Sequence, residues 1–301
     1  SPSANPDLPA QAWRQELAAG DEVIVTNHDH EANVGAWSRL EDAGIRIREW
    51  QVDPDTAELH LMDLENLLND RTRAVAFTHC SNIVGSVNPV RDTTDRIHEA
   101  GARAIVDGVS FCPHGLPDIL ALGADVYLFS LYKLYGPHLG VMYLNRELNE
   151  ELPYQGHFFN AGKPQARFTP AGPDHAQIAS VNGVMDYMEA VYRHHHKEDA
   201  AVSERAAAVR DLFRDQETRL LQPLLDYLVK HPAVRLIGKD RAAGRAPTVA
   251  FTVPGHSSAA LGRLLGERGF GVGVGHFYAY RLVEALGIDT GDGVVRISFV
   301  H

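Results

Sequence analysis

The sequence predicts an α/β protein with an open, mostly parallel and doubly wound sheet, joined to a smaller α+β domain. Short apolar runs alternate with helical patterns from residue 22 to residue 144, and residues 73–107 have the strand, helix and strand of one βαβ unit. After residue 200, a long helix with an apolar stripe is followed by strand-like pieces. We therefore expect a large domain at residues 1–199 and a smaller one at residues 200–301.

Hydrophobic periodicity and turn residues place the elements in order. Residues 1–19 indicate a turn followed by an amphipathic helix. Apolar runs of strand length occur at residues 22–26, 44–50, 73–78, 102–107, 126–129, 140–144, 234–237, 248–253, 271–274 and 295–299. Helical spacing occurs at residues 34–43, 63–68, 90–100, 119–122, 175–192, 200–229 and 258–268. Residues 150–172 are rich in glycine, proline and polar side chains and predict a long loop.

Composition favours a small-molecule substrate. The chain has 301 residues, and its net charge of -11 argues against nucleic acids and anionic membranes as partners. It contains no apolar run of about eighteen residues, the length that suggests a membrane helix. Two cysteines cannot form a disulfide framework, so the cytoplasm is the expected location. The three histidines at residues 194–196 point in different directions on a helix, so we expect no metal site there.

The segment VYLFSLYKLYGPHLGVMYL, residues 126–144, places a lysine between two apolar strands. A buried ammonium group is costly unless it is paired or chemically consumed. One way to consume it is a Schiff base between Lys133 and the aldehyde of pyridoxal 5'-phosphate (PLP). A solvated loop lysine is the simpler alternative.

A carboxylate that could serve such a cofactor lies one strand earlier. The strand ARAIVD ends at Asp107, and ligands of open α/β sheets bind at the carboxyl ends of the strands. PLP acts as an electron sink when a carboxylate faces its pyridine nitrogen. Asp107 alone could equally be a turn residue, but beside Lys133 it supports the cofactor hypothesis.

Residues 74–144 resemble the class V aminotransferase group of fold-type I PLP enzymes, and within it the cysteine desulfurase-like proteins. Two further segments carry the resemblance, HDHEAN at residues 28–33 and VRISF at residues 295–299. The similarity is specific for fold and cofactor but not for the reaction, because the group includes desulfurases, lyases, epimerases and aminotransferases. Beside this family the chain is expected to be incomplete at both ends.

The resemblance implies roles for individual residues. Lys133 would form the internal aldimine and act as general base at Cα. His30 would stack on the pyridine ring, with His28 as the alternative. Arg296 would bind the α-carboxylate of the substrate, unless it is an exposed strand arginine.

Further residues resemble cofactor ligands. Asn82 and Ser110 correspond to residues at the phenolic oxygen, although Asn82 is also an ordinary turn former. The residues that resemble phosphate ligands are Ser3, Ala4, Ser130 and Tyr132. Ser3 is equally a capping residue, and Tyr132 stands where the family has a histidine, so Ser130 and backbone donors should contribute more. Family members form the site at a dimer interface, which implies a homodimer.

The chain departs from the desulfurase pattern at the residue that should carry sulfur. Tyr278 stands where a cysteine is expected, and we expect Cys80 and Cys112 to be core thiols. We therefore predict a PLP-dependent lyase or aminotransferase acting on a small α-amino acid. Cysteine desulfurase and amino-acid epimerase are alternatives on the same fold, and a catalytically inactive PLP-fold binding protein is an alternative of another class. A dinucleotide-binding oxidoreductase is disfavoured because no G-x-G-x-x-G follows the first strand.

Overall fold

The computed structural model describes residues 7–169 and 172–301, and its largest element is a six-stranded sheet. The strand order is β2-β1-β3-β4-β5-β6, with the first five strands parallel and β6 antiparallel to β5. The strands are β1 (Glu22–Thr26), β2 (Arg46–Trp50), β3 (Thr72–Thr78), β4 (Arg103–Asp107), β5 (Val126–Ser130) and β6 (Gly140–Leu144). This confirms the predicted α/β architecture with a mostly parallel sheet.

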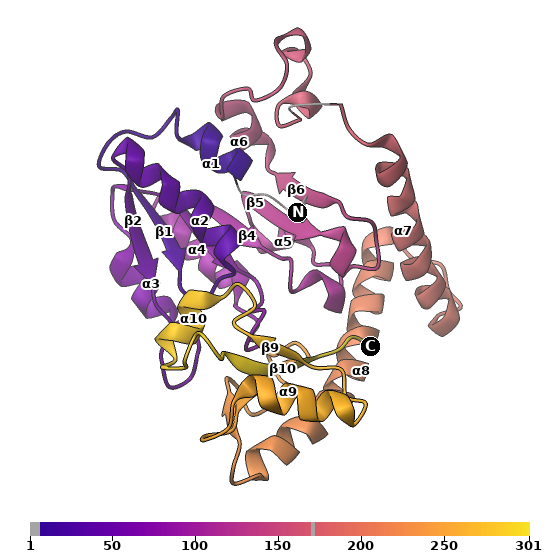
Figure 1. Ribbon diagram of the computed structural model, residues 1–301. Helices are drawn as coiled ribbons and strands as arrows, with labels where there is room; N and C mark the ends of the chain where they lie inside the picture. Colours follow the sequence, from indigo (N-terminus) through magenta and orange to yellow (C-terminus); the bar gives the residue numbers. More distant parts are fainter. Residues whose placement is uncertain (1–6, 170–171) are drawn as a thin grey trace.

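Helices cover both faces of this sheet (Figure 1). The helices of the first half are α1 (Asp7–Trp13), α2 (Glu31–Ser38), α3 (Leu61–Leu67), α4 (Val90–Glu99), α5 (Ile119–Leu122) and α6 (Arg146–Glu151). Because strand side chains alternate between faces, Ile24 joins the apolar cluster that contains Leu64 and Ile97, from α3 and α4. Its neighbour Val25 joins the cluster that contains Trp37 from α2. Both faces are therefore buried, as a parallel sheet requires.

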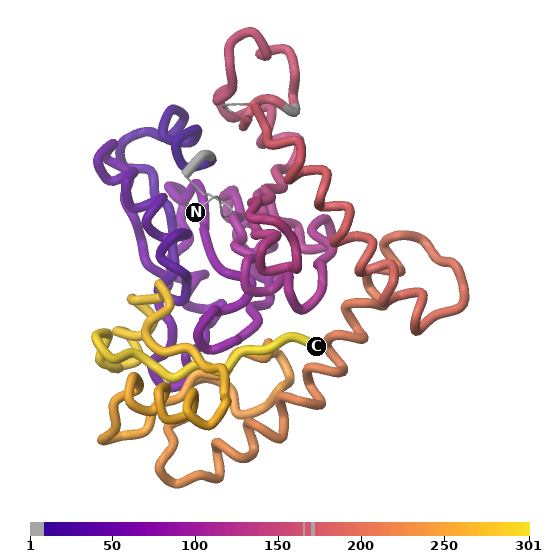
Figure 2. The backbone as a smooth tube through the Cα atoms, turned by 45° about the vertical axis from the view of Figure 1, so that its right-hand side comes forward, coloured from indigo at the N-terminus to yellow at the C-terminus, as the bar shows by residue number. Residues whose placement is uncertain are grey.

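A second sheet follows the two longest helices. These are α7 (His175–His195) and α8 (Val202–Lys230), which lie side by side along one flank of the molecule (Figures 1 and 2). Its strands are β7 (Arg235–Ile237), β8 (Thr248–Thr252), β9 (Gly273–Gly275) and β10 (Val294–Ser298). They pair antiparallel in the order β7-β8-β10-β9. A third apolar cluster joins the sheet to α8 and to α9 (Ser258–Glu267). Helix α10 (Tyr280–Ala285) precedes β10.

The loop after β3 connects the two sheets. Ser86 forms an isolated antiparallel bridge with Arg245, and the backbone N–H of Ala246 donates to the carbonyl of Gly85 at 2.8 Å. Gly85 has a φ of +68°, and a Cβ there would lie 2.5 Å from the carbonyl oxygen of Thr248. Glycine is required at this point because the two backbones approach so closely.

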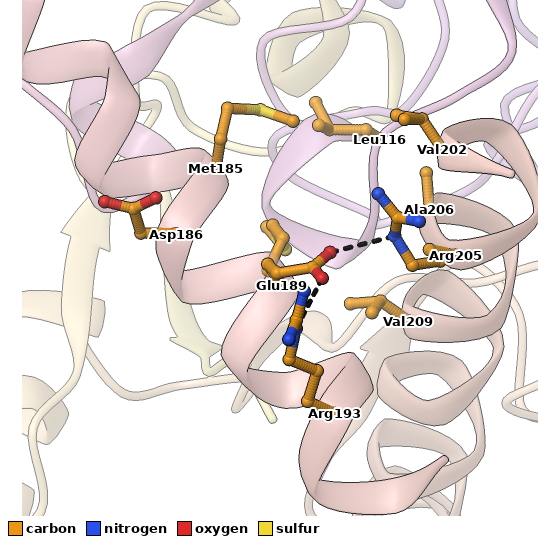
Figure 3. Close-up of a pocket in the computed structure, with 10 residues that line it drawn as sticks. Leu116, Met185, Asp186, Glu189, Arg193, Val202, Arg205, Ala206 and Val209 are labelled. Carbon is orange, nitrogen blue, oxygen red and sulfur yellow. Dashed lines mark hydrogen bonds and ion pairs between the residues drawn. The ribbon is translucent and has the colours of Figure 1, made fainter. Parts of the chain in front are cut away.

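Helices α7 and α8, together with Leu116, line a partly open cavity of about 360 Å³ (Figure 3). Its wall is mainly apolar, and Glu189 forms ion pairs with Arg193 at 2.6 Å and with Arg205 at 2.9 Å. The charge of Glu189 is thus balanced within the protein. The cavity shares no lining residue with the site described below.

Several element boundaries differ from the predictions. The helix expected at residues 34–43 is α2 followed by a 3₁₀ turn, Arg39–Ala43, and Gly44 in the left-handed conformation delays β2 until Arg46. Helices α6 and α10 were not predicted, because six residues are too few for a clear apolar period. The predicted division at residue 200 falls between α7 and α8 and stays a prediction. In the part of the chain that the structure describes, no helix has both the length and the apolar character to cross a membrane.

Candidate active site at the carboxyl edge of the large sheet

Polar residues that follow β1, β3, β4 and β5 meet at one edge of the large sheet. The strands run parallel, so their carboxyl ends lie together, and Asp107 pairs in register with Thr78 on one side and Leu128 on the other. A cavity of about 60 Å³ at this edge is lined by His30, Ala32, Thr78, Cys80, Asn82, Asp107, Val109, Ser110, Tyr132 and Lys133. Six of the residues that were predicted to have a catalytic or cofactor-binding role are therefore brought together here.

A second cavity, of about 300 Å³, adjoins the first. The two share Asn82, Ser110 and Lys133 as lining residues. The other residues that line the larger cavity are Pro113, His114, Thr248, Arg296, Ser298, Phe299 and Val300. Lys133 thus lines both cavities. The small one lies at the edge of the large sheet, and residues of β8 and β10 form part of the wall of the larger one.

Lys133 lies in a 3₁₀ turn, Leu131–Lys133, directly after β5. Burial lowers the pKa of its amine, the negative charge of Asp107 opposes this shift, and the positive charge of Arg296 adds to it. A lowered amine pKa increases the fraction of neutral, nucleophilic lysine near neutral pH. The position therefore favours covalent chemistry at Nζ.

Asp107 is the last residue of β4, and its Oδ1 accepts a hydrogen bond from the backbone N–H of Val109 at 2.8 Å. Burial raises the pKa of this carboxyl, while the Val109 hydrogen bond and the charge of Lys133 lower it. Asp107 and Lys133 thus influence each other's charge across the small cavity, although the ammonium lies beyond ion-pair distance.

A second buried carboxyl, Asp29, was missed in the sequence. Its side chain accepts hydrogen bonds from the hydroxyl of Thr26 and, at 2.8 Å, from the amide of Asn33. Burial raises the pKa of Asp29 to about 8, and the charge of Asp107 adds to the shift. Asp29 is therefore mostly protonated at neutral pH. Its place inside the HDHEAN segment was the only signal available.

His30, rather than His28, faces the small cavity. His30 caps the start of α2, where its Nδ1 accepts from the backbone N–H of Ala32 at 3.1 Å. Burial and the charge of Lys133 lower the pKa of His30 to about 4, so its ring is neutral and carries its hydrogen on Nε2. His28 is fully buried away from both cavities, and its Nδ1 lies 3.3 Å from the side-chain nitrogen of Asn88.

Asn82, Phe277 and Arg296 form one connected unit. The side-chain amide of Asn82 donates to the carbonyl of Phe277 at 2.8 Å, and the carbonyl of Asn82 accepts from Nη1 of Arg296 at 2.8 Å. The guanidinium of Arg296 also lies over the ring of Phe277, 3.7 Å from its centroid. Phe277 and Tyr278 have positive φ angles of 49° and 61°, which are strained for such side chains.

Two polar atoms of this unit have no hydrogen-bond partner among the described residues. They are Oδ1 of Asn82 and Nε of Arg296, and both are buried. Buried polar atoms are normally satisfied, so each is a candidate contact for a bound molecule. Burial also lowers the pKa of Arg296 from its usual value.

The other predicted residues have distinct positions. Ser110 lines both cavities, and Tyr132 lines the small one while its ring stacks on His138 at 4.6 Å. Ser130 ends β5 and is buried. Ser3 and Ala4 lie outside the described residues.

The two cysteines and Tyr278 differ sharply in exposure. Cys80 lines the small cavity, and burial raises its pKa to about 12. Cys112 is also buried, and burial raises its pKa further. Neither is a thiolate at neutral pH. Tyr278 is 69% exposed, and its ring lies 5.3 Å from the ring of His30.

Comparisons with known proteins match nearly the whole chain. The family model described as aminotransferase class-V matches residues 5–301. Over 299 residues the chain is 35% identical to the aminotransferase-like protein FGM3 of Gibberella zeae, covering 95% of this chain and 69% of that protein. It is 30% identical over 297 residues to a cysteine desulfurase of Cronobacter sakazakii, covering 94% of this chain and 68% of that one. The solved structure of the cysteine desulfurase CsdA from Escherichia coli superposes with a TM-score of 0.79 at 25% identity, covering 98% of this chain and 71% of that one.

Proposed function

Because the chain belongs to the class V aminotransferase family, we propose that it is a PLP-dependent enzyme that acts on a small α-amino acid. The observation that carries the proposal is the pair Lys133 and Asp107, which line one cavity at the carboxyl edge of the sheet. Burial lowers the pKa of the lysine amine, as a lysine that bonds an aldehyde requires. We favour a lyase or an aminotransferase reaction.

The residues of the small cavity fit this cofactor chemically. Lys133 would hold it covalently through Nζ, Asp107 would face its ring nitrogen, and the neutral ring of His30 would lie against its plane. Oδ1 of Asn82 is a buried polar atom that the protein leaves unsatisfied, and Ser110 offers a hydroxyl beside it. Ser130 and Tyr132 would contribute to the phosphate site, together with Ser3 and Ala4 outside the described residues.

When bound, PLP withdraws electrons from Cα of the substrate. The protein's own groups would do the rest. Arg296 would hold the α-carboxylate, with Nε as a free donor, and so orient the bond to be broken. Lys133 would move the proton at Cα, since its amine lies where both cavities meet. Asp107 cannot donate a hydrogen bond when it is ionised, and in that form it would keep the ring nitrogen protonated.

Tyr278 supports elimination or transamination over persulfide transfer. A phenol cannot accept sulfur as a thiolate does, and burial holds Cys80 as a thiol. Cysteine desulfurase is the second candidate, because relatives with that name are 30% identical to this chain. Epimerase activity and a binding protein without catalysis are further alternatives, and a homodimer and a cytoplasmic location stay predictions.

Absorbance and product analysis test the proposal. We expect the purified protein to take up PLP with a visible absorption band that disappears in Lys133→Ala. A panel of amino acids should then change that band and yield keto acid or ammonia. Sulfide released from cysteine by Cys80→Ala and Cys112→Ala alike would favour elimination over persulfide transfer. Failure of the wild type to take up PLP would refute the proposed function.

A further inference from the structure

The larger cavity is lined by basic side chains and by no acidic ones. Its lining includes Lys133 and Arg296 but no aspartate or glutamate. Within residues 7–169 and 172–301, no carboxylate lies within ion-pair distance of either cation. Burial lowers the pKa of Lys133, the charge of Asp107 opposes this, and the neighbouring cation Arg296 lowers it further. An anionic ligand would relieve this repulsion.

The wall of the same cavity includes an imidazole that a buried carboxylate orients. Nδ1 of His114 lies 2.9 Å from Oε1 of Glu217, a residue of α8 that is 4% exposed. His114 comes from the 3₁₀ turn Cys112–His114, so this contact joins the large sheet's half of the chain to α8. Nε2 of His114 makes no hydrogen bond with the described residues, and the side chain lines the cavity.

The contact with Glu217 determines which ring nitrogen of His114 faces a ligand. A carboxylate at Nδ1 holds a hydrogen there. An anion at Nε2 would bring a second hydrogen to the ring, because Nε2 donates only when both ring nitrogens carry one. The remaining polar lining residues, Ser110, Thr248 and Ser298, are hydroxyls that can also donate to an anion.

We propose that the larger cavity binds α-amino acids with a second anionic group on the side chain, with the α-carboxylate at Arg296 and the second group at His114. The inference rests on the proposed function and specifies its substrate class. A volume of about 300 Å³ suits a small dicarboxylic amino acid. His114 is here a binding residue that acts through Nε2, and Glu217 is a positioning residue.

Calorimetric titration of the full chain, as purified, tests the subsite without turnover. Succinate and butyrate are matched four-carbon probes with two and one carboxylates. We expect wild type to bind succinate at least about tenfold more tightly than butyrate, because only succinate has a second carboxylate that can accept a charge-assisted hydrogen bond. Equal affinities for the two probes would overturn the proposal.

Two variants separate the subsite from folding. His114→Asn keeps a donor near Glu217 but removes Nε2, and Glu217→Gln keeps the hydrogen bond but removes the charge. Both should lower succinate affinity toward that of butyrate and leave butyrate binding unchanged. Equal weakening of both probes would indicate a structural role and overturn the assignment.

A matched control exists elsewhere in the chain. His98 lies 2.8 Å from the buried Asp125, a similar imidazole–carboxylate pair that lines neither cavity. His98→Asn should keep the preference for succinate, and its loss there would count against the proposal. PLP uptake reports separately on the proposed function. If the protein takes up PLP normally but binds succinate no better than butyrate, only the proposed subsite is overturned. If it prefers succinate but takes up no PLP, the anion site is supported and the proposed function is refuted.

Discussion

Arg296 lies 3.7 Å above the ring of Phe277, a residue whose backbone has a positive φ. The contact joins β10 to the turn after β9 and restricts the guanidinium that we assign to substrate binding. The same guanidinium donates to the carbonyl of Asn82, from the loop after β3. A strained turn is thus maintained by the residue that it positions.

Replacing the aromatic platform should weaken substrate binding. Phe277→Leu removes a partly buried cation–π contact of about 1–2 kcal/mol, so the affinity for butyrate should fall about five- to thirtyfold. Titration calorimetry measures this directly. The control Phe270→Leu changes a side chain that is 61% exposed and should leave the affinity unchanged. An unaltered affinity in Phe277→Leu would show that the ring does not position Arg296.

A methyl group at Gly85 should disturb the junction of the two sheets. Gly85→Ala adds a Cβ 2.5 Å from the carbonyl oxygen of Thr248 at a φ of +68°. Strain and overpacking together should lower the free energy of unfolding by about 2–4 kcal/mol. Gly101→Ala is the matched control, because its φ is +75° but no atom lies within 4 Å of the added Cβ. It should cost only about 1 kcal/mol in urea unfolding. Equal losses in the two variants would contradict the role of close approach.

The buried carboxyl of Asp29 should make stability depend on pH. Its pKa is about 8 in the folded protein against an ordinary value of 3.8, so between these pH values the folded state binds more protons. This contribution is fully present below the lower value and is lost as pH rises through about 8. Asp29→Asn should therefore flatten the decline between pH 7 and pH 8, by up to about 1.4 kcal/mol per pH unit.

The midpoints of urea unfolding of wild type and Asp29→Asn, measured between pH 7 and pH 8, test this prediction. The histidines near Asp29 do not interfere, because both proteins share them. Burial lowers the pKa of His28 and of His79 to about 3 and that of the partly buried His30 to about 4, so in the folded protein they titrate in the acid range. Parallel curves for wild type and Asp29→Asn would mean that Asp29 is already ionised in the folded protein.

The core beneath the site should be sensitive to volume. Trp37 on α2 is completely buried and packs against Trp13 with ring centroids 5.6 Å apart. Trp37→Ala should cost about 3–5 kcal/mol, from lost transfer free energy and the cavity left behind. Met62→Ala, at a side chain that is 72% exposed, should stay within about 0.5 kcal/mol of wild type. Thermal unfolding followed by circular dichroism distinguishes the two.

The arrangement of Lys133 and Asp107 could be predicted because it depends on local rules. Apolar runs define strands, parallel strands end at a common edge, and a polar residue at each end must then lie near its neighbour. The same rules predicted the mostly parallel sheet. They could not predict α6 or α10, whose few residues leave no clear period, nor Gly44, whose left-handed backbone shifts the start of β2.

The sequence alone therefore determined the fold class, the family resemblance and the candidate lysine, since these are written in short-range patterns. Tertiary structure decided that His30 rather than His28 lines the cavity, and that the pKa of Asp29 is raised by burial and by the charge of Asp107. It also decided that Glu217 contacts His114, 103 positions away in the chain. The physical reason is that burial and pairing, which set charge and hydrogen bonding, arise from contacts between distant segments. Side-chain chemistry at a site is fixed only when those segments pack.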